Sequence, residues 1–183
     1  SDTESSEEEP RKNDASYQIL DLQSDLTDLI EDIRASGRVA IASEFTTKDP
    51  LVGDLVSLAF STKSGVASYL PFGHQKAFEL TLEGENQEAV ENLSGLDSRE
   101  MSEIRGILED PEIEKVGHDL KRTALLLARA GVKLRGLSFD VMIASYLFDP
   151  GSRDHGVASL AFKELSRTIC DRKDLVGSGR SQR

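Results

Sequence analysis

The fold is decided by residues 113–148, which read IEKVGHDLKRTALLLARAGVKLRGLSFDVMIASYLF. The pattern predicts a short strand over 113–117 and then a helix that begins after Asp119, whose carboxylate can accept a backbone N–H of the first turn. That helix runs to about Ala130 and ends at Gly131, a residue that readily adopts the left-handed conformation. A second strand near 137–139 leads into a helix that begins at Asp140. Alternating strands and helices with short connections indicate an α/β fold.

The continuous apolar run over 124–128 predicts that the first of these helices is buried on most sides. Upstream, the pattern predicts a helix over 24–36, a buried strand over 39–42 and a hairpin with strands at 55–61 and 66–70. Further helices are expected around 101–108 and 157–165, and a short one around 87–93. Three strands before the helix-linked strands predict a mixed sheet of about five strands flanked by helices.

Composition limits the class of protein. The chain has 183 residues, a net charge of −11 and one cysteine, Cys170, which suits a reducing cytoplasm. We expect a leader or linker over 1–15 that is disordered or serves as an interaction tail, one domain over 16–169, and an irregular segment over 170–183. No apolar run reaches the length of a membrane span, so no membrane partner is expected. The chain lacks the basic patch that a free-standing nucleic-acid-binding protein usually has.

Four segments carry a resemblance to a known family: VGHDLK at 116–121, the run 134–147, GVASYLP at 65–71 and HGVASLA at 155–161. In this order they resemble the proofreading 3′–5′ exonuclease domain of bacterial DNA polymerase I, over roughly residues 38–165. The resemblance implies a ribonuclease H-like, DnaQ-like exonuclease fold. It also implies hydrolysis with two divalent metals, which several carboxylates must hold.

The carboxylates that the resemblance implies are largely missing. Where the family has Asp-x-Glu on the first strand, this chain has Ala42-Ser43-Glu44, so that only Glu44 remains as a remnant of the catalytic site. The metal-binding Asp of the second site corresponds to Thr123. The third motif, Tyr-x-x-x-Asp, is not found, and we expect the natural protein to continue beyond Arg183 with that helix. If the alignment holds, Thr123 faces Glu44 from its helix.

Other acids have simpler explanations than metal binding. Asp119 and Asp140 are expected to cap helices, whereas Asp49 and Asp54 are expected to be solvated in a loop. The three histidines, His74, His118 and His155, lack the short spacings of zinc sites. Three residues are weak candidates for nucleic-acid contact, although such residues more often lie on a solvated face: His118, Lys121 and Arg122.

The sequence therefore predicts a vestigial 3′–5′ exonuclease domain of a DNA polymerase I, a cytoplasmic enzyme of DNA replication and repair. Such a domain is a structural platform beside the polymerase domain of the same polypeptide, and DNA is contacted through the full-length protein. No cofactor is expected. Two alternatives stay open: an active exonuclease with rearranged ligands for magnesium or manganese, and a stand-alone interaction module on the same fold.

Overall fold

The computed structural model describes residues 15–22, 24–47, 49, 52–74 and 91–169. Its elements, in chain order, are β1 (Ser16–Ile19), α1 (Thr27–Ser36), β2 (Arg38–Phe45), β3 (Leu55–Ser61), β4 (Val66–Pro71), α2 (Ser102–Glu109), β5 (Glu114–Gly117), α3 (Leu120–Arg129), β6 (Leu137–Asp140), α4 (Val141–Phe148) and α5 (Val157–Leu165). None of the helices in these ranges is long and apolar enough to cross a membrane.

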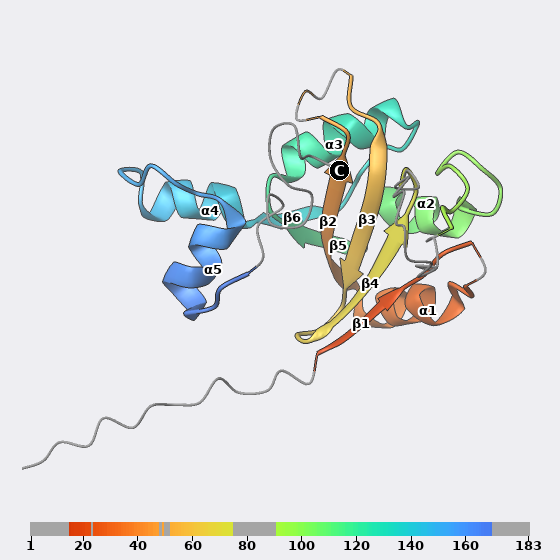
Figure 1. Cartoon of the computed structure of the whole chain (residues 1–183), viewed down its shortest axis with the longest axis horizontal. Coiled ribbons are helices and arrows are strands. Elements are labelled where there is room, and N and C mark those ends of the chain that lie inside the picture. The colour runs from red at the N-terminus through yellow and green to blue at the C-terminus, as the bar shows by residue number, and fades with distance from the viewer. Residues whose placement is uncertain (1–14, 23, 48, 50–51, 75–90, 170–183) are drawn as a thin grey trace, which may run out of the picture.

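The strands form one mixed sheet in the order β1-β4-β3-β2-β5-β6. β2, β3 and β4 pair antiparallel, while β1 pairs parallel with β4, and β5 and β6 continue parallel from β2 (Figure 1). The prediction of a mixed α/β sheet is confirmed. The sheet has six strands where about five were predicted. The additional strand is β1: all four of its residues are exposed, so no burial pattern marked it.

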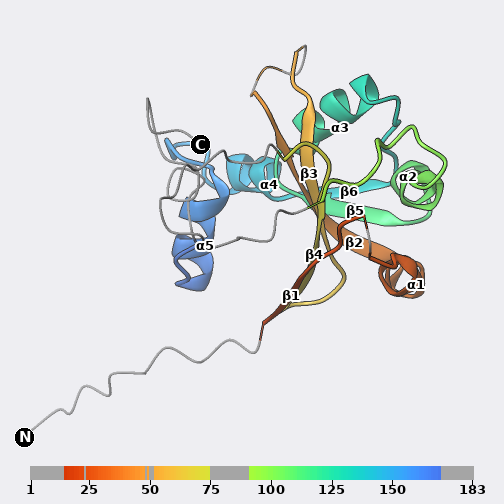
Figure 2. The same ribbon diagram turned by 45° about the vertical axis from the view of Figure 1, so that its right-hand side comes forward.

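The main hydrophobic core lies between one face of the sheet and α1, α2 and α3. Figure 2 shows these three helices together on one side of the sheet, whereas α4 and α5 lie apart from them, beyond the edge strand β6. The sheet contributes alternate residues of β2, such as Val39 and Ile41, because successive side chains point to opposite faces. α1 buries Leu29, Ile30 and Ile33 and ends at Gly37 in the left-handed conformation.

The prediction that α3 is buried on most sides is wrong. Leu126 and Leu127 are buried against the sheet, but Leu125 is 48% exposed and Ala128 also faces solvent. α4 is more extreme, since it is almost wholly apolar and has no buried residue. An apolar run thus marks the helix but not the number of sides on which it is covered.

Some of the predicted segments lie partly or wholly outside the residues that the structure describes. The predicted helix around 87–93 lies mostly outside the described residues, and 91–93 are not helical. The leader over 1–14 and the segment 170–183 also lie outside them. The helix after Asp140 and the helix around 157–165 are both present as α4 and α5.

Candidate functional site

Thr123, which corresponds to one of the family's metal ligands, lies where α3 crosses the central strand β2, and its contact there is with Ser43. The side-chain hydroxyls of Ser43 and Thr123 lie 2.8 Å apart and form a hydrogen bond between residues 80 positions apart in the chain. Thr123 is only 6% exposed. Each hydroxyl group therefore has a hydrogen-bond partner in the packed contact between helix and strand, as buried polar groups usually do.

Ala42 and Glu44 do not take part in this contact. Successive side chains of a strand alternate, so both point to the sheet face opposite to Ser43. In register, Glu44 lies beside Ser57 of β3. Burial raises the pKa of the Tyr69 hydroxyl, a hydrogen bond with Ser57 opposes the rise, and the charge of Glu44 adds to it. Glu44 thus faces a small polar group on the far side of the sheet.

The expectation that Thr123 faces Glu44 is therefore wrong in detail. α3 does lie against β2, as predicted, but the residue that Thr123 contacts is Ser43. The sequence pattern located the helix and the strand correctly, whereas the direction of each side chain depends on how the helix is rotated about its own axis. A carboxylate introduced at position 123 would enter the core side, where Ser43 already occupies the space.

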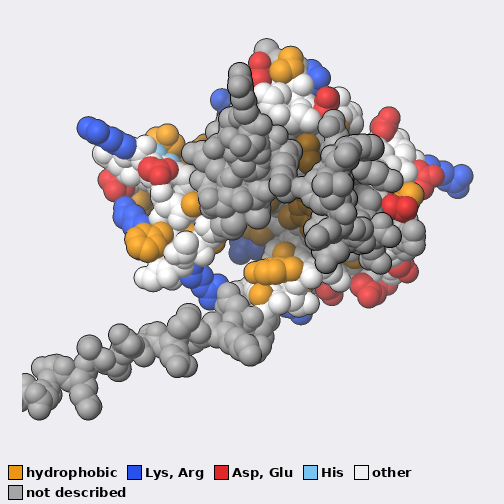
Figure 3. Space-filling view, viewed as in Figure 1, with side chains coloured by type: hydrophobic (Ala, Val, Ile, Leu, Met, Phe, Trp, Pro, Cys, Tyr) orange, Lys and Arg blue, Asp and Glu red, His pale blue; other side chains and the backbone are white. Residues whose placement is uncertain are grey.

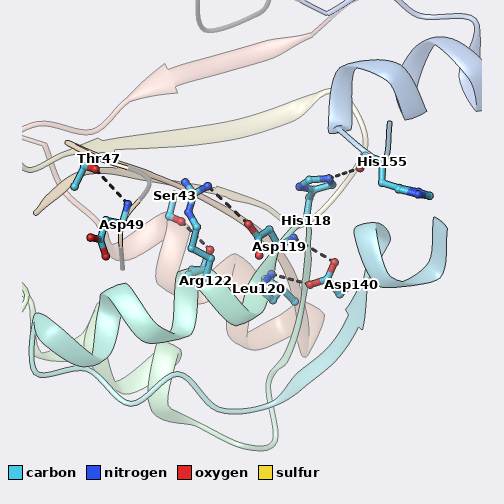
Figure 4. Close-up of polar contacts among 10 residues, drawn as sticks. Ser43, Thr47, Asp49, His118, Asp119, Leu120, Arg122, Asp140 and His155 are labelled. Atoms are coloured by element: carbon cyan, nitrogen blue, oxygen red, sulfur yellow. Dashed lines mark hydrogen bonds and ion pairs between the residues drawn. The ribbon is translucent and has the colours of Figure 1, made fainter. Parts of the chain in front are cut away.

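The start of α3 is held by a carboxylate from elsewhere in the chain. Asp119 is the N-cap residue, but its backbone is left-handed (φ 56°) and its side chain accepts no capping hydrogen bond. Instead, the Asp140 carboxylate accepts the backbone N–H groups of Asp119 at 3.2 Å and Leu120 at 2.7 Å (Figure 4). The prediction that Asp119 caps the helix with its own side chain is wrong.

Asp140 also caps its own helix, as predicted. Its Oδ1 accepts the N–H groups of Met142 at 2.9 Å and Ile143 at 3.4 Å. One carboxylate thus satisfies donors at the N-termini of both α3 and α4, where a negative charge is favourable. The sequence indicated the local cap; the second role depends on β5 and β6 lying side by side, which no local signal reveals.

The candidate nucleic-acid residues have different surroundings. His118 donates from Nε2 to the backbone carbonyl of His155 at 2.8 Å (Figure 4). Arg122 lies 3.7 Å from Asp119 in an ion pair, and Lys121 is exposed. Contact of these three residues with DNA stays a prediction.

The other histidines are structural in this arrangement. His155 is 7% exposed, its Nδ1 lies 2.8 Å from the Ser145 hydroxyl, and its ring stacks on Tyr146. A hydrogen bond of 2.6 Å joins Nε2 of His74 and the hydroxyl of Tyr69. His155 was missed as a buried residue because an isolated histidine in a polar loop gives no periodic signal.

The donor set at the β2–α3 crossing does not fit a two-metal site. Two cations about 4 Å apart require several converging carboxylates, and here the crossing holds two neutral hydroxyls. Asp49 and Asp54 are exposed beyond the strand, as predicted for loop acids. Across the described ranges, no group of three or more His, Cys, Asp or Glu side chains could hold a metal ion.

Similarity to known proteins agrees with the geometry of the fold. DNA polymerase I of Pseudomonas aeruginosa is 27% identical over 177 residues, which are 96% of this chain and 18% of that protein. DNA polymerase I of Rhizobium leguminosarum is 30% identical over 164 residues, 83% of this chain and 15% of that protein. The chain thus spans less than a fifth of the length of these curated relatives.

A solved structure shows the same fold within a larger chain. This chain superimposes with a TM-score of 0.61, at 22% identity, on a structure of the POL domain of Pol1 from M. smegmatis. That domain is in complex with DNA primer-template and dNTP. The match covers 84% of this chain and 23% of that one. The profile of the family described as "DNA polymerase I, ribonuclease H-like domain" matches residues 72–182, and the chain therefore belongs to this family of DNA polymerase I exonuclease-like domains.

Proposed function

We propose that this domain is a vestigial 3′–5′ exonuclease: it keeps the fold of a proofreading domain but does not hydrolyse DNA. Its role is that of a structural platform beside the polymerase domain of a cytoplasmic DNA polymerase I. DNA is bound by the full-length protein during replication and repair, and the platform needs no cofactor.

The observation that carries this proposal is the hydrogen bond between Ser43 and Thr123. A hydroxyl pair 2.8 Å apart has no net charge, and one of the two groups donates its proton to the other. Divalent magnesium and manganese prefer charged oxygen ligands, and a site without them leaves the charge of the two cations uncompensated. Glu44, the one carboxylate at a matching position, lies on the other face of β2.

A second observation supports the structural role. Asp140 accepts four backbone N–H groups from the starts of α3 and α4. Withdrawing this carboxylate to bind a metal would leave those donors unsatisfied, at a cost of about 1 kcal/mol or more for each helix. The Asp140 carboxylate is thus committed to holding the starts of two helices in place.

The test uses the full-length protein and a primer with a mismatched 3′ end. We expect template-directed extension of a matched primer in magnesium or manganese, and no release of the mismatched terminal nucleotide in either metal. The proposal is wrong if a metal-dependent release of 3′ nucleotides is observed and Glu44→Gln abolishes it while extension is unchanged. That result would favour the active exonuclease with rearranged ligands.

A further inference from the structure

An apolar groove runs between α3 and α4, with β6 as its floor. Its volume is about 650 Å³. Its apolar lining includes Leu125 and Ala128 of α3, Phe139 of β6, and Ile143 and Leu147 of α4. Its charged lining residues are Lys121, Lys133 and Asp140, and the Asp140 carboxylate accepts backbone N–H groups at the starts of α3 and α4. It lies on the side of α3 that faces away from the Ser43–Thr123 contact.

The walls of this groove are unusually exposed for large apolar side chains. Leu125 is 48% exposed, Phe139 53% and Leu147 79%. Further large apolar side chains are exposed on α4 and α5, among them Phe148 and Phe162, and Figure 3 shows several separate apolar patches at its left. Contiguous exposed apolar surface like that lining the groove marks an interaction site, because leaving it in water forgoes the free energy of burial.

The shape of the groove favours a helix as its occupant. On α3 the lining residues are spaced four apart, as in Ala124 and Ala128, and on α4 Ile143 and Leu147 have the same spacing. Two helices with such rows leave a furrow into which the apolar side of a third helix can pack.

The rim of the groove favours acidic flanks on that helix. Lys121 and Lys133 are both exposed, and neither forms an ion pair with another residue in the described ranges. The chain as a whole carries a net charge of −11, so this pair of lysines at an apolar groove is complementary to acidic side chains of a partner.

We infer that the α3–β6–α4 groove is the docking site of an amphipathic helix with acidic flanks, contributed by the polymerase part of the same polypeptide. The curated relatives, of which this chain spans 15–18%, carry ample polypeptide outside this domain to supply such a helix. The inference rests on the proposed role as a platform within a DNA polymerase I. It does not depend on the loss of exonuclease activity, so the primer assay above can fail while this docking holds.

The test places a photoreactive p-benzoylphenylalanine at position 125 of the full-length protein, with the same residue at position 52 as the control. Val52 is 60% exposed and lies in the loop between β2 and β3, outside the groove. After irradiation and digestion, we expect one intramolecular cross-link from position 125 to a helical segment outside residues 1–183, and none to that segment from position 52. A cross-link within residues 1–183, to a helix with the Tyr-x-x-x-Asp motif or to a second molecule overturns the inference, and so does a yield no higher than that of the control.

The acidic flanks are tested by charge reversal at the rim. Lys133→Glu should lower the yield of the cross-link from position 125 at least fivefold, because it places like charges together. Lys63→Glu, on the exposed hairpin between β3 and β4, should leave the yield within twofold. Equal yields in the two variants would show that the occupant has no acidic flank. Primer extension by each variant checks that the protein is folded.

Discussion

The two sides of α3 differ in character, although one continuous apolar run supplies both. On one side, Thr123, Leu126 and Leu127 are buried against the sheet. On the other, Leu125 and Ala128 are exposed and line the groove toward α4. The buried side is fixed by the architecture of the domain itself. The exposed side combines the apolar Leu125 and Ala128 with Lys121, and it stays open to solvent in the described chain, as a surface for a partner must.

The largest expected effect separates these sides with one chemical change. Leu127→Ala should lower the free energy of unfolding by about 2 to 5 kcal/mol, because Leu127 is fully buried and its removal leaves a cavity. Leu125→Ala, two residues earlier, should cost less than about 1 kcal/mol in the isolated chain, because the side chain already faces water. Urea denaturation of the two variants and the unmodified chain measures both. Equal losses would mean that α3 is covered on both sides.

The next effect concerns the buried hydroxyl pair. Thr123→Asp should lower the free energy of unfolding by about 2 to 4 kcal/mol at neutral pH, because a charge is placed on the buried side of α3. Ala42→Asp, on an exposed position of the opposite face, should change it by less than about 1 kcal/mol. Thermal or urea unfolding of the two single variants makes the comparison, and Thr123→Asn is the uncharged control of similar shape.

The pH dependence of Thr123→Asp carries a definite sign. Burial raises the pKa of an introduced carboxyl above its value in the unfolded chain, so the folded state disfavours the charged form. The part of the destabilisation that the charge causes should be absent well below about pH 4, where the carboxyl is protonated in both states. It should grow as the pH rises through the unfolded pKa. Manganese should not restore stability, even when Ala42→Asp is added, because the two carboxylates lie on opposite faces of β2. A saturable stabilisation by manganese would mean that the ligand positions converge after all.

Sequence reasoning recovered what depends on local periodicity. The helix that buries Leu29, Ile30 and Ile33 was predicted from its spacing, and Gly131 does adopt a positive φ just after α3. The hairpin strands and the helices after Asp140 were located in the same way. β1 was missed because Ser16–Ile19 are held by backbone pairing with β4 and bury no side chain.

The candidate site was recovered only as a set of positions. The pairing of Ser43 with Thr123 joins residues 80 apart, and the bonds from Asp140 to the start of α3 join residues about 20 apart. Both depend on how far a helix is rotated about its own axis against the sheet. The spacing of apolar residues shows which side of the helix is buried, but not which individual side chains meet. The resemblance to the exonuclease family identified the right strand and helix but could not show which side chains meet.

Two lysines allow the same comparison between a buried and an exposed side chain outside α3. Lys115 of β5 is fully buried, and its ammonium group donates to the backbone carbonyl of Asp110 at 2.5 Å. Burial lowers the pKa of Lys115 to about 8, and the nearby charge of Asp110 opposes the shift in part. Lys133, at the rim of the groove, is exposed.

The last effect we expect is the pH dependence of stability that Lys115 causes. Its pKa is lower in the folded chain than in the unfolded one, where it is near 10.5, so the unfolded state binds more protons between about pH 8 and 10.5. Over this window the unmodified chain should gain stability relative to Lys115→Met by on the order of 1 kcal/mol for each pH unit, because each pKa unit corresponds to about 1.4 kcal/mol. Below pH 8 the difference should be constant. Lys133→Met is the control, since it removes an exposed lysine of the same chain. Urea unfolding at pH 7, 8.5 and 10 measures these differences, and parallel curves for the two variants would mean that the ammonium of Lys115 reaches water.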